Sequence, residues 1–256
     1  MAEKRDECWI GKREKEASVP KVHEEEIFPL WHHARNIERI KGLYGMVVDD
    51  QDKDIISLID GKRILDVGAG YGLLVKKLRG LGYDPTGIEP DEGLIYYAKK
   101  YFSTELLNRS IYKTDFPEGY FDTVIIRETL PHLDFDKALS EIGRICGKTV
   151  VIFDSAVQPL LKLARSIMGH HEYNQKELND YMGILKNNGY EIIDIRFRDI
   201  FVFPLSGGYI SPFALPASGW FGKVMITADG ITNFIINRIG LQKILCWRYL
   251  IKARKK

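Results

Sequence analysis

Several features that would define a class of protein are scarce or missing in this chain of 256 residues. Only three cysteines occur, far apart and without C-x-x-C spacing, so neither a disulfide framework nor a cysteine-based zinc site is expected. No uninterrupted apolar helix of roughly 18 residues is present, and the N-terminus is charged where a secretory signal would be apolar. These absences predict a cytoplasmic protein in a reducing compartment.

An excess of charge of one sign is also missing. Lys and Arg total 37 and Asp and Glu total 35, so the net charge is +2 and there is no general electrostatic case for binding nucleic acid. The basic residues that do cluster lie at the C-terminus, in residues 252–256. A short basic tail is usually solvated, and it can also contact anionic lipid head groups.

Strands and helices are expected to alternate through most of the chain. Apolar runs and helical spacing predict strands at 63–67, 83–88, 110–112, 121–127, 148–153, 191–197 and 247–252, and helices at 71–81, 91–102, 135–145 and 174–188. Such alternation predicts an α/β fold with a doubly wound, mainly parallel sheet and helices on both faces. Four aspartates within residues 49–54 lack the spacing of a calcium loop, and a solvated loop is expected there.

The chain divides into four expected parts. Residues 1–45 form a charged segment and a helical lid, and residues 46–198 form the core of the fold. Residues 199–245 form an apolar insertion between the last two strands, and residues 246–256 form the last strand and the basic tail.

A glycine-rich segment, ILDVGAGYGLL at residues 64–74, joins the first expected strand to the first helix. Because glycine lacks a Cβ, Gly68, Gly70 and Gly72 allow a tight turn and close approach of a ligand to backbone N–H groups. The helix N-terminus beyond the loop adds donors and a partial positive charge. Glu89 ends the next strand, 19 residues after Gly70, where its carboxylate can accept hydrogen bonds from both ribose hydroxyls. The segment therefore predicts a nucleoside-cofactor site.

The spacing of this loop resembles that of class I S-adenosylmethionine-dependent methyltransferases, of the type that acts on small molecules, lipids or quinones. Asp66 stands two residues before the first of three glycines spaced G-x-G-x-G, similar to the family signature D/E-x-G-x-G-x-G. Dinucleotide enzymes favour G-x-G-x-x-G instead. An acid in the loop also suits the cationic amino and sulfonium groups of S-adenosylmethionine. The resemblance covers residues from about 60 to 197, and it implies a Rossmann-like seven-stranded sheet and S-adenosylmethionine as the cofactor.

The resemblance suggests further cofactor contacts. In this family an acid after the third strand usually faces the adenine amino group, which makes Asp115 the candidate, with Phe116 beside the ring. The alternative role for Asp115 is capping the turn before Pro117. Arg127, at the end of the fourth strand, is a candidate both for the methionine carboxylate and for pairing with a carboxylate of the protein.

The active site of this fold opens at the carboxyl ends of the strands, where residues 128–132 lie. Methyl transfer is a displacement at an activated carbon, so the protein chiefly positions the nucleophile and removes its proton where needed. His132 is the first candidate for a base or an acceptor contact, and Glu128 is the second. Helix capping or a surface loop is the alternative for His132. No metal is expected, because His32-His33 and residues 170–172 lack identifiable partner ligands.

The methyl acceptor is indicated only by the apolar insertion. Residues 200–222 carry no charge, but three prolines and a Gly-Gly pair rule out one continuous membrane helix. Apolar positions at helical spacing follow within residues 231–245. One interpretation is a wall for a small or lipid-like acceptor, such as a lipid or quinone, with peripheral membrane contact. The other is a cover packed on the sheet or a homodimer interface.

Other functions stay open beside this one. They are a methyltransferase acting on protein or RNA and a non-catalytic S-adenosylmethionine-binding subunit. A nicotinamide-dependent oxidoreductase is disfavoured, because the third glycine falls one residue too early for a dinucleotide loop.

Overall fold

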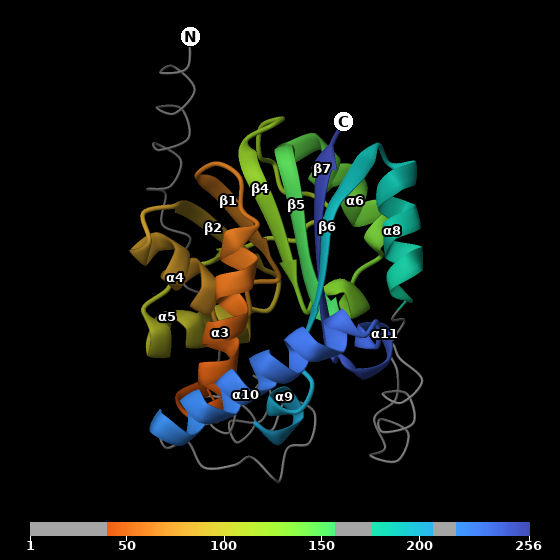
Figure 1. The fold of residues 1–256 in the computed structure, drawn as a ribbon. Helices are drawn as coiled ribbons and strands as arrows, with labels where there is room; N and C mark the ends of the chain where they lie inside the picture. Colours follow the sequence, from red (N-terminus) through yellow and green to blue (C-terminus); the bar gives the residue numbers. More distant parts are fainter. Residues whose placement is uncertain (1–39, 157–175, 207–218) are drawn as a thin grey trace. The chain divides into compact units, whose positions relative to one another are not determined.

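Strands and helices alternate along residues 40–156, 176–206 and 219–256, which the computed structural model describes (Figure 1). The strands are β1 (Arg63–Val67), β2 (Asp84–Glu89), β3 (Leu107–Asn108), β4 (Phe121–Arg127), β5 (Cys146–Ser155), β6 (Tyr190–Arg198) and β7 (Arg248–Lys255). The helices are α3 (Leu43–Ser57), α4 (Leu73–Gly80), α5 (Glu92–Phe102), the 3₁₀ helix η1 (Leu130–His132), α6 (Phe135–Ile145), α8 (Leu178–Asn187), α9 (Val202–Leu205), α10 (Gly219–Arg238) and α11 (Gln242–Leu245).

The strands form one seven-stranded sheet in the order β3-β2-β1-β4-β5-β7-β6. Neighbouring strands are parallel from β3 to β5, and β7 runs antiparallel to both of its neighbours. This confirms the α/β fold and the mainly parallel sheet expected from the sequence. The chain builds outward from β1 to β3 and then returns to β4, so the strand order reverses between β1 and β4. In open parallel sheets, ligands bind at the carboxyl ends of the strands at such a reversal.

Helices cover both faces of the sheet because right-handed crossovers place α4, on the outward run, and α6, on the return run, on opposite sides. On one face, Ile55 and Leu58 pack with Leu74 and Leu78 of α4 against the central strands. On the other, α6 packs against α8, where the Phe135 and Tyr181 rings stand 5.5 Å apart. Asp91 caps α5 by accepting a hydrogen bond from the Leu94 amide at 3.0 Å, as expected for that residue.

Two local predictions are wrong. The four aspartates of residues 49–54 lie on α3 and not in a solvated loop, because α3 continues through them with its apolar side buried. The third strand is Leu107–Asn108 and not residues 110–112, because Leu107 and Asn108 align with the end of β2, whereas Ser110 accepts a turn hydrogen bond from Lys113.

The insertion contains more helix than its sequence indicated, since α10 begins at Gly219. Among the described residues, no helix combines the length and the apolar character needed to cross a bilayer. The predictions for the lid segment with His32-His33, for residues 170–172 and for most of the charge-free stretch fall outside the described residues.

Candidate active site

The loop between β1 and α4 adopts backbone conformations that glycine reaches most readily. Gly68, Gly70 and Gly72 have φ angles of +68°, +55° and +68°. A Cβ on Gly68 would lie 2.6 Å from Thr129, and one on Gly72 would lie 2.5 Å from Thr104. At Gly70, by contrast, nothing stands within 4 Å of an added Cβ. Packing therefore requires glycine at positions 68 and 72, whereas the backbone at Gly70 borders open space.

Glu89 lies beside this loop, where its spacing predicts it. One carboxylate oxygen accepts a hydrogen bond from the Gly70 amide at 2.9 Å, and the other accepts one from the Asp91 amide at 3.1 Å. Burial raises the pKa of Glu89, although these two amides and the charge of His132 oppose that shift.

Asp66, at the end of β1, is almost completely buried. Burial raises its pKa to about 7; the charge of Arg127 opposes this shift, whereas the charges of Asp52 and Glu89 add to it. Its charge state near neutral pH therefore depends on any cation placed beside it.

Arg127 is held by α3. Its guanidinium forms an ion pair with Asp52, donates to the Gln51 side-chain oxygen at 3.0 Å, and lies 5.5 Å from the centre of the Phe153 ring. Of the two roles considered for Arg127, the structure contains the pairing with a protein carboxylate. The sequence did not reveal the partners, because the segment that carries them was expected to be a loop.

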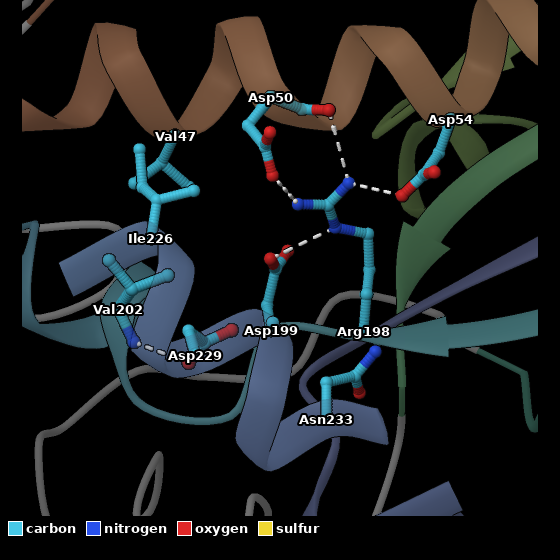
Figure 2. A pocket seen from close by; sticks show the side chains of 10 residues that line it. Val47, Asp50, Asp54, Arg198, Asp199, Val202, Ile226, Asp229 and Asn233 are labelled. Atoms are coloured by element: carbon cyan, nitrogen blue, oxygen red, sulfur yellow. Dashed lines mark hydrogen bonds and ion pairs between the residues drawn. The ribbon is translucent and has the colours of Figure 1, made fainter. Parts of the chain in front are cut away.

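A second arginine contacts the same turns of α3, beside a cavity of about 100 Å³ between α3, β6 and α10 (Figure 2). Arg198 donates to Asp50 at 2.9 Å and to Asp199 at 3.0 Å, and it also pairs with Asp54. Burial opposes the charge of Arg198, but these carboxylates raise its pKa overall. Asp199 in turn accepts a hydrogen bond from Gln51 at 2.7 Å, so a continuous polar network joins the ends of β4 and β6 through α3.

The loop after β4 is fixed from two sides. Glu128, which has a φ of +51°, forms an ion pair at 3.0 Å with Arg248, a residue 1% exposed. Asp154 accepts a hydrogen bond from the Leu130 amide at 3.1 Å, and burial raises the pKa of Asp154 to about 7. Sequence reasoning missed Asp154 and Arg248, and the available signal for Asp154 was a charged residue directly after the apolar run of β5.

The remaining candidates occupy different environments. His132 is exposed at the end of η1. Asp115 is exposed and has a φ of +58°, whereas the Phe116 ring is buried and packs at 4.8 Å against Phe121 and at 6.0 Å against Tyr120. In the part of the chain that the structure describes, no group of three or more His, Cys, Asp or Glu side chains is arranged to hold a metal ion.

Comparisons with known proteins agree with this geometry. Residues 65–153 match the family model of a methyltransferase domain. The structure is similar to an S-adenosylmethionine-dependent methyltransferase from Archaeoglobus fulgidus, with 19% identity and a TM-score of 0.59 over 82% of this chain and 94% of that one. No curated protein matches the chain.

Two further similar structures are named for their substrates. One is the magnesium protoporphyrin IX methyltransferase of Synechocystis, with 15% identity and a TM-score of 0.54 over 82% of this chain and 83% of that one. The other is the geranyl diphosphate C-methyltransferase of Streptomyces coelicolor, with 15% identity and a TM-score of 0.57 over 83% and 80%. Both were crystallised with S-adenosylhomocysteine. At such identities the structural matches establish the fold.

The residues around the glycine loop fit S-adenosylmethionine. Open space at Gly70 leaves room for a ligand against the backbone, and the Glu89 carboxylate is an acceptor suited to ribose hydroxyls. The buried acid Asp66 suits a cationic ligand. Residues 65–153 thus form a methyltransferase domain, and the seven-stranded sheet has the fold of class I S-adenosylmethionine-dependent methyltransferases.

Proposed function

We propose that this enzyme transfers the methyl group to a small hydrophobic acceptor that binds at the carboxyl edge of the sheet, beside α9. The observation that carries the proposal is a direct link between the loop after β4 and the insertion. Arg248 pairs with Glu128 of that loop, and its guanidinium lies 4.1 Å from the centre of the Phe203 ring of α9. The loop expected to face the acceptor is thereby joined to apolar side chains.

Those side chains belong to a larger apolar cluster. Leu43, Val47, Val202 and Phe203 form its buried centre, and it is surrounded by Tyr44, Phe201, Met225, Ile226 and Trp247. The surrounding side chains are only partly buried and so leave some apolar area accessible, which favours an acceptor of low polarity. The geranyl diphosphate and magnesium protoporphyrin IX named for the two similar structures support an acceptor of this kind. We assign residues 199–245 as the cover of the acceptor pocket on this basis.

Each cofactor contact has a proposed role. Glu89 binds the ribose hydroxyls, Asp66 faces the cationic end, and Asp115 binds the adenine amino group with Phe116 beside the ring. Arg127 holds α3 against β4 through its ion pair with Asp52, and its positive charge favours the ionised form of Asp66. S-adenosylmethionine supplies, when bound, a methyl group on a sulfonium that is already a good leaving group.

The protein's own task is then to position the acceptor and to accept its proton where it has one. The exposed imidazole of His132, in the loop after β4, is our candidate acceptor of that proton. Glu128 is tied to Arg248, so we assign it to fixing the loop instead of to proton transfer.

The acceptor class is tested by measuring S-adenosylhomocysteine release in the presence of separate pools of isoprenoid quinones, lipids, total RNA and unfolded protein. We expect release only with an apolar pool. Release with RNA or protein alone would reassign the acceptor, and cofactor binding without release in any pool would favour a non-catalytic subunit.

The ribose contact is tested by Glu89→Ala. We expect S-adenosylhomocysteine to bind about 10- to 150-fold more weakly, which corresponds to roughly 1.5–3 kcal/mol for a charge-assisted hydrogen bond. Glu118→Ala, at an exposed acid on the turn before β4, is the matched control and should leave affinity unchanged. Unaltered binding by Glu89→Ala refutes the assignment.

The role of His132 is tested by His132→Ala. Loss of a general base lowers turnover by about 100-fold or more, while cofactor affinity stays within about twofold. His132→Gln separates the two roles, because glutamine can keep a hydrogen bond to the acceptor but cannot take its proton. Wild-type turnover in both variants would show that the acceptor binds elsewhere.

A further inference from the structure

Large apolar side chains line the outer side of α10 and α11. They are Trp220, Val224, Ile231, Phe234 and Ile235 on α10, and Ile239, Leu241 and Ile244 after it, with exposed fractions from 39% to 71%. On α10, Trp220, Val224 and Ile231 are spaced by four and seven residues, and Phe234 and Ile235 follow Ile231 by three and four, so they occupy one side of the helix. We call these residues the α10–α11 surface.

The opposite side of α10 is firmly packed, so the direction of the exposed side is fixed. A Cβ on Gly222 would lie 2.5 Å from the sulfur of Met46, which shows how closely α10 approaches α3. The Asn233 side chain donates to the Phe197 carbonyl at 3.0 Å. Figure 1 shows α10 running alongside α9 and meeting α3 near the helix's first turns.

In the same segment the basic side chains are exposed and the single acidic one is buried. Lys223, Arg238 and Lys243 are exposed. The only acid between residues 219 and 245 is Asp229, which is buried and accepts hydrogen bonds from the Phe201 amide at 2.7 Å and the Val202 amide at 3.0 Å. The outer side therefore combines apolar and cationic groups without a carboxylate.

We propose that the α10–α11 surface docks on an anionic lipid bilayer, with α10 lying in the interfacial plane. Interfacial helices bury apolar side chains, aromatic ones included, at the level of the head groups, while neighbouring lysines and arginines bind lipid phosphates. Charge complementarity favours this occupant over a second copy of the chain. Two copies face to face would bring three cations from each side together with no carboxylate from this segment to pair with them.

The apolar part of the surface is tested by binding of the full chain to vesicles. Equal parts of phosphatidylglycerol and phosphatidylcholine should bind the wild type in a flotation assay, and pure phosphatidylcholine should bind it far more weakly. Phe234→Ser/Ile235→Ser should weaken binding at least about 10-fold, since two side chains leave the interface. Leu81→Ser/Ile193→Ser, at exposed apolar residues on other elements, is the matched control and should change binding less than about twofold.

The cationic part is tested by Lys223→Glu/Arg238→Glu/Lys243→Glu. Each charge lost near an anionic surface should weaken binding by about fivefold, and added salt should reduce the difference. Arg79→Glu/Lys99→Glu/Lys186→Glu changes the net charge equally at exposed positions elsewhere and should have a much smaller effect.

Vesicle binding is read without methyl transfer, so its outcome is separate from that of the proposed function. S-adenosylhomocysteine affinity confirms that each variant is folded. Failure of the wild type to bind anionic vesicles, or equal losses in the test and control variants, overturns the proposal. So does a wild-type dimer that Phe234→Ser/Ile235→Ser converts into a monomer, because that result assigns the surface to a second copy.

Discussion

Replacing Arg127 by glutamine separates support of the fold from binding of the cofactor. In the structure the Arg127 side chain is 15% exposed and pairs with Asp52, which is 3% exposed. The substitution removes the cation but keeps a polar side chain of similar length. It leaves the buried carboxylate of Asp52 with Lys77 alone, whose ammonium lies 3.2 Å away.

The expected loss follows from burial. Removing one partner of a buried ion pair costs about 3–5 kcal/mol, because the other charge stays desolvated. Lys77 still neutralises part of the charge of Asp52, so we expect the lower end, about 3 kcal/mol. In a protein of this size that corresponds to a fall in Tm of roughly 6–12 °C.

Urea denaturation followed by tryptophan fluorescence measures the change in the free energy of unfolding, and calorimetric titration measures S-adenosylhomocysteine binding to the folded variant. The matched control is Arg196→Gln, which breaks an ion pair with Asp194 whose two side chains are 40% and 34% exposed. Exposed pairs contribute little, so the control should lose less than about 1 kcal/mol. Cofactor affinity should change less than about threefold in both variants.

The opposite pattern would refute this reasoning. If Arg127→Gln keeps its stability within about 1 kcal/mol but loses cofactor affinity by an order of magnitude, Arg127 serves the methionine carboxylate. The double variant Asp52→Asn/Arg127→Gln adds a second check. It should lose less than the sum of the single losses, because neither buried charge is left alone.

Three further predictions concern stability. Asp66→Asn should stabilise the cofactor-free protein increasingly as pH rises from about 4 to about 7, by up to about 4 kcal/mol in urea titrations. Burial raises the pKa of Asp66 from 3.8 in the unfolded chain to about 7 in the folded protein. The wild type therefore keeps its full stability below the unfolded pKa, where Asp66 is neutral in both states, and loses stability as the pH rises through the folded pKa, whereas asparagine stays neutral. Asp229→Ala should cost about 2 kcal/mol in the same assay, because three backbone amides at the start of α9 lose their acceptor. Gly72→Ala should lower Tm by several degrees, since it has a φ of +68° and no room for a Cβ, whereas Gly80→Ala, with open space in α4, should not.

Local pattern determined the cofactor half of this protein. The loop at residues 64–74, the cap at Asp91 and the helix at 135–145 follow from glycine positions, side-chain capping chemistry and helical spacing. Each of these depends on residues within a few positions of one another, so the sequence by itself specifies them. Even the place of Glu89 follows, because one strand–helix–strand unit brings it back to the loop.

Tertiary structure decided the contacts of the loop after β4 and of Arg127 at the end of β4. Arg127 and Asp52 are 75 residues apart, Asp154 and the Leu130 amide are 24 apart, and Arg248 of β7 reaches Glu128 only because β7 inserts between β5 and β6. The order of strands and the packing of α3 set these contacts, and local sequence periodicity predicts neither of them. Tertiary structure also determines which side of α10 is exposed. The apolar pattern of this segment was visible in the sequence, but the close packing of Gly222 against α3 decides which side faces away from the protein.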